Sequence, residues 1–317
     1  MINQEVKYVI IIPLYKDWES LETLLQNIRQ VLQDDWIFSK IIIVDDFSLL
    51  TLPTYLESYK NTITVLELTR NLGHQKAITI GLSYGVNTYA LAENFIVMDA
   101  DGEDRPEDIP VLFEAIRKNM YGVCFAHRQK RNEDRSFRFF YKLYKFLFRV
   151  LTGKVISFGN FCILTAESAK RIIHVSEIWL HFSSGVIKSR LIFGSVPTKR
   201  GSRYHGKSKM DYPNLINHGL SAIAVYSDLV AIRITLIAIF MSLVSLVAIG
   251  IIICIKQFTT LAIPGWASQV TIGFTIIIGQ FFSLGVLLSF VVLSSKTVKN
   301  VNPALVYPEF IYKSHFF

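Results

Sequence analysis

The chain has 317 residues, 51% of them hydrophobic, and a formal net charge of +8 at pH 7. This length allows one large domain or two modest ones, and the hydrophobic fraction is high for a soluble protein. The positive charge does not indicate nucleic-acid binding, because the basic residues concentrate beside two long apolar runs and the sequence has no helix-turn-helix, zinc or RNA-binding motif.

The first part of the chain alternates between buried strands and amphipathic helices. Short β-branched runs predict strands, and apolar residues at helical spacing predict the helices between them. This alternation is typical of an α/β fold with a mostly parallel sheet covered by helices on both faces. The predicted strands are 6–13, 40–44, 62–68, 95–98 and 122–126, and the predicted helices are 19–32, 73–84 and 110–118.

Polar residues follow most of these strands at the point where each strand ends. A parallel sheet gathers such positions along one edge, where open α/β sheets bind ligands. No dinucleotide-type glycine fingerprint and no Gly-Lys-Ser/Thr phosphate loop occurs, which disfavours a Rossmann dehydrogenase or a P-loop enzyme. The strand-end groups are Pro13-Leu-Tyr15, Asp45-Asp46, Arg70-Asn71, Asp99 and Asp101.

The segment after the fourth predicted strand is the most acidic of these groups. Asp99 and Asp101 directly follow Phe95–Met98, and Glu103 and Asp104 add further charge. Taken alone, the segment fits either a loop that caps the helix beginning near residue 106 or a site for Mg²⁺ or Mn²⁺. Its place in a series of strand-end motifs favours the metal site.

Two basic segments follow. Residues 135–151 predict an amphipathic helix with aromatic and basic faces, which lies either at an anionic membrane surface or against the sheet with a solvated basic face. Residues 200–209 contain four basic residues and no acidic one, and they predict an anion-binding loop. From residue 213 an apolar stripe predicts a juxtamembrane helix.

Two apolar runs near the end of the chain predict transmembrane helices. Ile234–Ile255 is 22 residues without a charge, long enough to cross a hydrocarbon core of roughly 30 Å. A second span extends from about Val270 to Ser294 after a short loop near 256–269. Basic residues flank the outer ends of both spans and no secretory signal precedes the first strand, so both termini are expected in the cytoplasm.

These motifs, in this order, resemble the inverting GT-A glycosyltransferases that use polyprenyl phosphate. That family includes dolichyl-phosphate mannose synthase and bacterial undecaprenyl-phosphate glucosyltransferases of the GtrB type. The resemblance covers nearly the whole chain. It is carried by Pro13-Leu-Tyr15, Val44-Asp-Asp-Phe-Ser48, Arg70-Asn-Leu-Gly-His-Gln75, Asp99-Ala-Asp101, Arg203-Tyr-His-Gly-Lys-Ser-Lys209 and Pro264-Gly-Trp-Ala-Ser268.

The resemblance implies a cytoplasmic, Rossmann-like GT-A domain at 1–206, an amphipathic juxtamembrane helix at 207–230, two spans within 231–295 and a cytoplasmic tail at 296–317. It implies transfer of one sugar from a nucleotide diphosphate sugar, UDP-linked rather than GDP-linked, to undecaprenyl phosphate at the bacterial inner membrane. The implied cofactor is Mg²⁺ or Mn²⁺, and the implied partners are membrane lipids and further copies of the chain.

The resemblance also implies roles for individual residues. The nucleotide would be bound by Pro13, Tyr15, Asp45, Asp46, Arg70 and Asp99. The metal ligands would be Asp101, Glu103 and Asp99. The donor diphosphate and lipid phosphate would be held by Arg128, Arg131, Arg203, Lys207 and Lys209. The catalytic residues would be Asp99, Asp101 and Asn160.

The sequence departs from the family pattern in three places. Relatives often read Asp-Ala-Asp-Leu-Gln-Asp-Pro-Pro-Glu, whereas this chain has Gly102, Glu103 and Arg105 in place of Leu, Gln and the first Pro. Phe47 stands where glycine is usual. Asn160 stands where bacterial relatives often carry an aspartate considered as a base. A phosphate monoester has a second pKa of about 6 and is already nucleophilic at neutral pH, so the reaction does not require that base.

The departures leave an alternative open, a nucleotide-sugar-binding membrane protein of the same fold with impaired catalysis. A processive polysaccharide synthase is disfavoured, because it would need more spans and a Gln-x-x-Arg-Trp motif that this sequence lacks.

Overall fold

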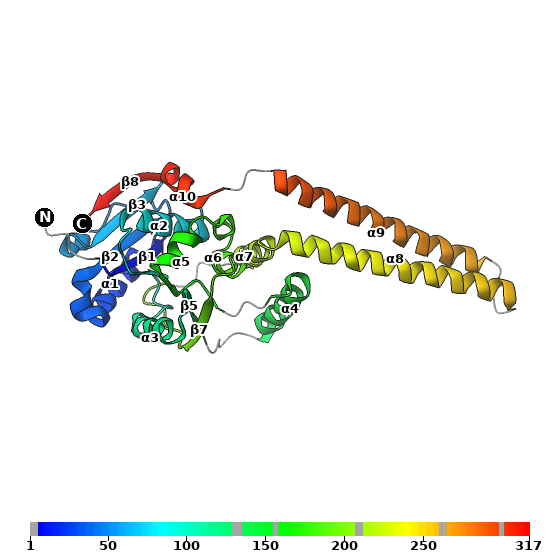
Figure 1. The fold of residues 1–317 in the computed structure, drawn as a ribbon, viewed down its shortest axis with the longest axis horizontal. Helices are drawn as coiled ribbons and strands as arrows, with labels where there is room; N and C mark the ends of the chain where they lie inside the picture. The colour runs from blue at the N-terminus through cyan, green and yellow to red at the C-terminus, as the bar shows by residue number, and fades with distance from the viewer. Residues whose placement is uncertain are drawn as a thin grey trace. The chain divides into compact units, whose positions relative to one another are not determined.

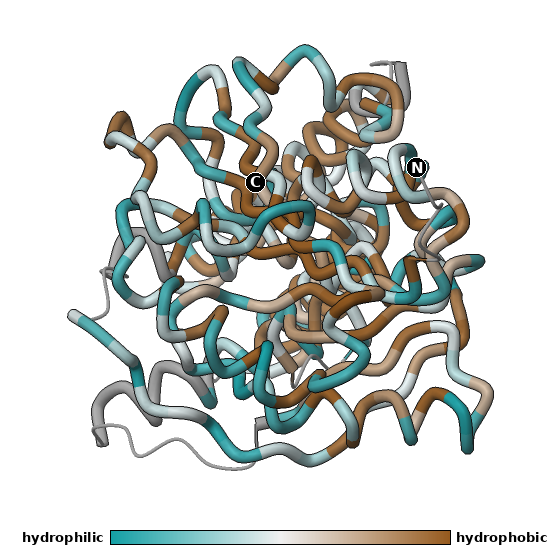
Figure 2. The backbone as a smooth tube through the Cα atoms, turned by 90° about the vertical axis from the view of Figure 1, so that its left-hand side faces the viewer, coloured by the Kyte–Doolittle hydropathy of each residue, from teal (hydrophilic) through white to brown (hydrophobic). Residues whose placement is uncertain are grey.

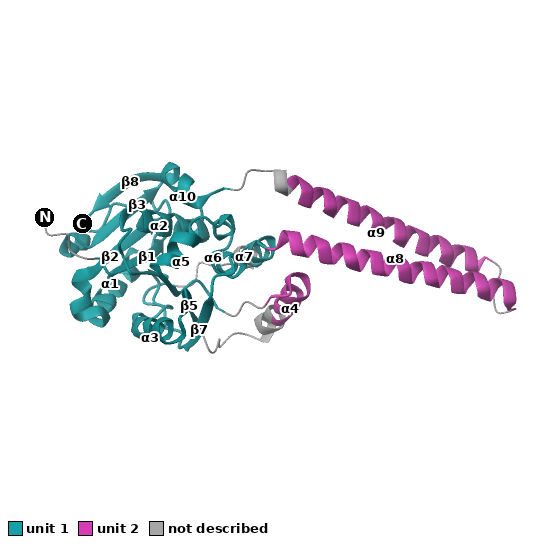
Figure 3. Cartoon of the chain, viewed as in Figure 1, with its two compact units in different colours: residues 1–141, 156–225, 300–317 teal, residues 142–155, 226–299 magenta. Residues whose placement is uncertain are grey.

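The computed structural model describes residues 6–128, 135–154, 158–206, 212–259, 263, 265–297 and 301–317. The chain divides into two compact units (Figure 3). The sheet unit comprises residues 1–141, 156–225 and 300–317, and the helical unit comprises residues 142–155 and 226–299.

The sheet unit is built on eight strands in the order β7-β5-β6-β4-β1-β2-β3-β8. The pairs β1–β2, β1–β4, β2–β3 and β5–β7 are parallel, whereas β6 runs antiparallel to both its neighbours and β8 antiparallel to β3. The predicted α/β fold with a mostly parallel sheet is confirmed (Figure 1). The strands are β1 Tyr8–Leu14, β2 Ser39–Asp45, β3 Ile63–Leu68, β4 Asn94–Val97, β5 Val123–Arg128, β6 Cys162–Thr165, β7 Phe193–Thr198 and β8 Ile311–Phe316.

Helices cover both faces of this sheet. Alternate residues of β1 serve the two cores, since Ile10 and Ile12 pack with α1 and α3 while Val9 and Ile11 pack with α2, α5 and α6. Hydrophilic residues gather on the outer loops (Figure 2). The helices are α1 Trp18–Leu32, α2 His74–Thr88, α3 Ile109–Asn119, α5 Ala166–Ile172, α6 Phe182–Lys188, α7 Tyr212–Ala224 and α10 Pro303–Val306, with 3₁₀ turns at Gln33–Phe38, Thr54–Tyr59, Pro106–Asp108, Ser176–Trp179 and Tyr307–Phe310.

A glycine sets the close approach of α2 to the sheet. A Cβ at Gly81 would lie 2.6 Å from Ile11 Cγ2 and 2.7 Å from Val44 Cγ2. No larger residue fits there without displacing the helix. This packing fixes the N-terminal end of α2 near the carboxyl edge of β1 and β2.

The C-terminal segment differs from the separate tail expected at 296–317. Residues 300–317 belong to the sheet unit, where β8 pairs with β3 and the Phe317 N–H donates to Ile63 O at 2.8 Å. The pairing covers the outer hydrogen-bonding groups of β3, which would otherwise be a sheet edge. A short run of β-formers, Ile311–Phe316, is the only sequence signal for this strand.

The helical unit contains α8, Ser227–Phe258, and α9, Trp266–Thr297. Both are long and apolar enough to cross a membrane, and they lie side by side (Figure 1). The predicted helix at 135–151 is α4, Arg135–Thr152, and its second half belongs to this unit. Arg233 of α8 donates to the Val150 carbonyl at 2.7 Å and so ties α4 to the first apolar helix.

Buried His181 gives the sheet unit a pH-dependent stability. Its Nδ1 accepts the Ser184 N–H at the start of α6, and burial, with His218 nearby, lowers its pKa to about 3. The unfolded chain therefore binds a proton below pH 6.5 that the folded chain does not, so stability is complete above pH 6.5 and falls as the pH drops towards 3.

We expect acidification to pH 5 to cost the wild-type protein about 2 kcal/mol of unfolding free energy through His181. The His181→Asn variant keeps a helix-capping acceptor without the titration. Unfolding of both proteins, followed by tryptophan fluorescence at pH 7.5 and 5, checks this. An equal loss in the two proteins would contradict the assignment to His181.

Candidate active site

The strand-end residues meet at one edge of the sheet, as expected from parallel pairing. β1 and β2 end at the same level, with Leu14 opposite Asp45. The pairing of β2 with β3 places Asp45 opposite Glu67. Pro13 is buried within β1, whereas the side chains of Tyr15 and Arg70 are exposed beyond the strands. Exposed groups beside buried strand ends make this edge the candidate ligand-binding surface.

The paired aspartates after β2 hold the loops around them. Asp45 Oδ1 accepts the Ser48 N–H at 3.1 Å and also the Ser48 hydroxyl. The two carboxylate oxygens of Asp46 accept the N–H groups of Leu72 at 2.6 Å and Gly73 at 2.9 Å. The structure therefore gives Asp46 a clear role in fixing the loop between β3 and α2, while contact of either aspartate with a nucleotide stays a prediction.

The acidic loop, residues 99–104, is shaped by its own carboxylates. Buried Asp104 accepts the Asp99 N–H at 2.9 Å, and Asp101 Oδ1 accepts the Glu103 N–H at 2.9 Å. Gly102 adopts φ +87°, a conformation that side chains rarely take. These hydrogen bonds turn the chain sharply after β4 and hold Asp99 and Asp101 within the acidic loop.

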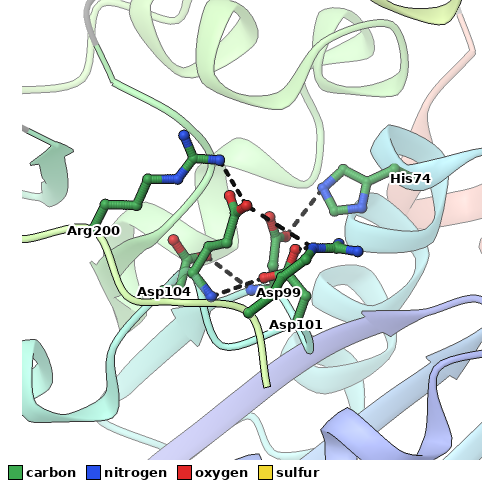
Figure 4. Close-up of polar contacts among 7 residues, drawn as sticks. His74, Asp99, Asp101, Asp104 and Arg200 are labelled. Atoms are coloured by element: carbon green, nitrogen blue, oxygen red, sulfur yellow. Dashed lines mark hydrogen bonds and ion pairs between the residues drawn. The ribbon is translucent and has the colours of Figure 1, made fainter. Parts of the chain in front are cut away.

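Two arginines from the segment after β7 bind the acidic loop (Figure 4). Arg203 Nη2 lies 2.5 Å from Asp101 Oδ2, and Arg200 Nη2 lies 2.6 Å from Glu103 Oε1. All four side chains are at most one-third exposed. The structure thus places Arg203 beside the acidic loop together with Arg200, the first residue of the predicted anion-binding loop.

His74, the first residue of α2, faces the acidic loop from the other side (Figure 4). Its Nε2 lies 3.2 Å from Asp99 Oδ1 and 3.2 Å from Asn160 Nδ2. Asn160 therefore lies beside His74, while its part in catalysis stays a prediction. His74 was missed, although it stands in the same strand-end motif as Arg70.

The pKa values of the site reflect burial and crowded charge. Burial, reinforced by the neighbouring Asp99, raises the pKa of Asp101 despite its hydrogen bonds to the Glu103 N–H and Arg203. Burial also raises the pKa of Asp45 and of Asp46. Loss of solvation lowers the pKa of His74, but the carboxylates of the acidic loop outweigh it and the net pKa rises. The acidic loop is therefore a place where added positive charge is favourable.

The acidic loop fits a divalent cation that is shared with a phosphate ligand. Among the described residues, no group of three or more His, Cys, Asp or Glu side chains is arranged to hold a metal ion by itself. Mg²⁺ in proteins is commonly held by only one or two carboxylates together with substrate phosphates. Asp99 and Asp101 are the candidates for that set. Burial and the neighbouring Asp99 raise the pKa of Asp101, so an added cation would stabilise its ionised form.

Several predicted phosphate-binding residues are not placed. The backbone of Arg128 ends β5, but its side chain lies outside the described residues, as do Arg131, Lys207 and Lys209. Of that group the structure brings only Arg203 to the acidic loop among the residues it describes.

Comparison with known proteins agrees with this architecture. Residues 9–171 match the model of glycosyl transferase family 2. An uncharacterised glycosyltransferase of Synechocystis is 28% identical over 89% of this chain and 89% of its own length. The undecaprenyl-phosphate 4-deoxy-4-formamido-L-arabinose transferase of Edwardsiella ictaluri is 27% identical over 88% of this chain and 86% of its own length.

Among solved structures, the glucosyl-3-phosphoglycerate synthase of Mycobacterium tuberculosis, in complex with Mn²⁺, UDP-glucose and phosphoglyceric acid, shares the fold. Its TM-score is 0.51 at 14% identity, over 71% of this chain and 79% of that one. With the family model matching residues 9–171 and relatives aligned over most of its length, the chain belongs to glycosyl transferase family 2 and is a glycosyltransferase.

Proposed function

We propose that this glycosyltransferase moves one sugar from a UDP-sugar to undecaprenyl phosphate at the cytoplasmic face of the membrane, with inversion at the anomeric carbon. The observation that carries the proposal is a strand-end carboxylate site, bordered by Arg203 and His74, in a chain that also contains two membrane-length apolar helices. The relative from Edwardsiella ictaluri, named for transfer to undecaprenyl phosphate, supports the acceptor.

The donor would lie along the carboxyl edge of β1, β2 and β4. Tyr15 and Arg70 are exposed there and would contact the base and ribose, beside Asp45, which is held by Ser48. Asp99 and Asp101 would hold Mg²⁺ or Mn²⁺, which supplies positive charge to the leaving diphosphate. Arg203 would add a guanidinium to the same phosphates, a pairing that is strong because it is charge-assisted.

The acceptor would attack through an oxygen of its phosphate. That oxygen is ionised at neutral pH, so no side chain has to remove a proton from it. Asn160 would then orient the substrate. Its Oδ1 atom is buried with no hydrogen-bond partner among the described residues, and it can accept a hydrogen bond from a sugar hydroxyl. His74, whose Nε2 lies 3.2 Å from both Asp99 Oδ1 and Asn160 Nδ2, would help to keep both side chains in place.

Turnover by the purified protein tests the proposal. With Mn²⁺, a panel of UDP-sugars and undecaprenyl phosphate, we expect a lipid-linked sugar phosphate and free UDP. Chelation with EDTA should abolish the reaction, and undecaprenol, which lacks the ionised phosphate, should not be glycosylated. Tight nucleotide binding without turnover of any donor would instead favour a binding protein with impaired catalysis.

A further inference from the structure

The basic segment, residues 200–204, is docked on the acidic loop through its backbone. The Gly201 N–H donates to Glu103 O at 3.0 Å, and the Tyr204 N–H donates to Asp101 O at 3.0 Å. Two main-chain bonds three residues apart fix which residues of the two segments face each other. The arginine contacts at the site therefore belong to a defined docked arrangement.

Two ion pairs between side chains stabilise the same arrangement of the basic segment on the acidic loop. Arg200 binds Glu103 at 2.6 Å, and Arg203 binds Asp101 at 2.5 Å. Each of these two carboxylates, which the family resemblance assigned to the metal, is thus already paired with an arginine guanidinium. A divalent cation on Asp101 would lie beside the Arg203 charge and repel it.

Two of the residues that depart from the family pattern, Gly102 and Glu103, contact the basic segment. A Cβ at Gly102 would lie 2.6 Å from the ring of Tyr204, so a leucine at this position could not accept the ring as it lies. The Tyr204 hydroxyl in turn accepts a hydrogen bond from Asn27 of α1 at 2.8 Å. Gly102 and Glu103 are therefore matched to Tyr204 and Arg200.

We propose that Glu103 is the docking partner of Arg200 rather than a metal ligand, and that Arg203 exchanges Asp101 for the donor diphosphate when the cation binds. This inference rests on the proposed function. The exchange is chemically favourable because the cation repels the guanidinium from Asp101, while the diphosphate offers it oxygens in the geometry that arginine binds best. Glu103, Gly102 and Tyr204 keep the basic segment beside the site during the exchange.

Measuring how tightly the Arg203→Gln variant binds Mn²⁺ and UDP distinguishes this exchange from a fixed ion pair between Arg203 and Asp101. Removing the competing guanidinium should lower the Kd for Mn²⁺ alone by roughly three- to tenfold. The Kd for UDP at saturating Mn²⁺ should rise by about tenfold, because a phosphate contact is lost. Isothermal titration calorimetry measures both. Arg171→Gln removes an arginine from an exposed pair with Glu167 on α5 and is the control, expected to change neither value.

The exchange requires that Arg203→Gln lower the Kd for Mn²⁺ and raise the Kd for UDP. If Arg203→Gln shifts both dissociation constants in the same direction, or shifts neither, the exchange is wrong. If the wild-type protein binds no UDP in the presence of Mn²⁺, the proposed function itself fails, which is a distinct result.

Glu103→Gln tests the docking role separately. We expect faster hydrogen exchange in the peptide that contains Gly201 and Tyr204, with Mn²⁺ affinity within about twofold of wild type. Arg200→Gln should accelerate exchange equally, and the double variant should be no faster than either single one, as expected for partners in one pair. A substantial loss of Mn²⁺ affinity in Glu103→Gln would make Glu103 a metal ligand and overturn the assignment.

Discussion

Asp101→Asn is expected to reduce metal-dependent turnover by at least about a hundredfold, the scale on which single groups that stabilise developing charge contribute to catalysis. Asp101 Oδ2 lies 2.5 Å from Arg203 Nη2, and Asp101 belongs to the acidic loop that follows β4. Asparagine is nearly isosteric with aspartate, so the lost activity would come from the lost charge.

The loop itself should survive this substitution. The asparagine carbonyl can still accept the Glu103 N–H that Asp101 Oδ1 accepts at 2.9 Å. Burial and the nearby Asp99 raise the pKa of Asp101, so a neutral side chain relieves an unfavourable charge in the metal-free protein. We therefore expect a melting temperature close to that of the wild type without added metal.

The matched control for Asp101→Asn is Glu107→Gln. Glu107 is in the adjacent 3₁₀ turn, half-exposed, and its Oε2 lies 3.4 Å from Arg105 Nε. The two variants remove the same charge within seven residues of chain, and initial rates over a Mn²⁺ titration compare them. Normal rates are expected from Glu107→Gln. Near-normal turnover by Asp101→Asn would refute the assignment of the acidic loop as the metal-diphosphate site.

The sequence predicts the parts of this fold that local patterns determine. The strands β1 to β5 follow from short β-branched runs, and parallel pairing follows from the helices between them. The strands β6, β7 and β8 were not predicted, because the identity of each depends on a partner distant in the chain. β6 lies between β4 and β5, and β8 pairs with β3 across more than two hundred residues.

The same distinction holds for the site. Asp99 and Asp101 could be assigned to this edge because parallel topology brings strand ends together, whereas Asn160 was assigned from the family resemblance. The sequence does not show that Glu103 meets Arg200, 97 residues away, instead of a cation. Both arrangements satisfy a carboxylate, and only the folded chain shows that Arg200 Nη2 lies 2.6 Å from Glu103 Oε1. The residue types therefore predict which chemistry this edge of the sheet can support. Which charged side chains pair with one another is visible only in the tertiary structure.

Asp46→Ala is expected to have the largest effect on stability among changes near the site. The Asp46 side chain is buried, and its two oxygens accept the N–H groups of Leu72 and Gly73. Alanine would leave both donors without these acceptors, at a cost of about 1–3 kcal/mol for each. Part of this is offset, because burial raises the pKa of Asp46 and its charge is itself costly in the folded chain. We expect a net loss of roughly 2–3 kcal/mol of unfolding free energy.

The change should also weaken nucleotide binding, because the residues held by Asp46 connect Arg70 to His74. Asp46→Asn keeps one acceptor oxygen, so its losses in stability and in UDP affinity should be intermediate. Asp34→Ala, which removes an exposed carboxylate after α1, is the control. Chemical unfolding and calorimetry with UDP and Mn²⁺ measure the two properties on the same preparations. Normal UDP affinity in a destabilised Asp46→Ala would show that Asp46 supports the fold without ordering the nucleotide site.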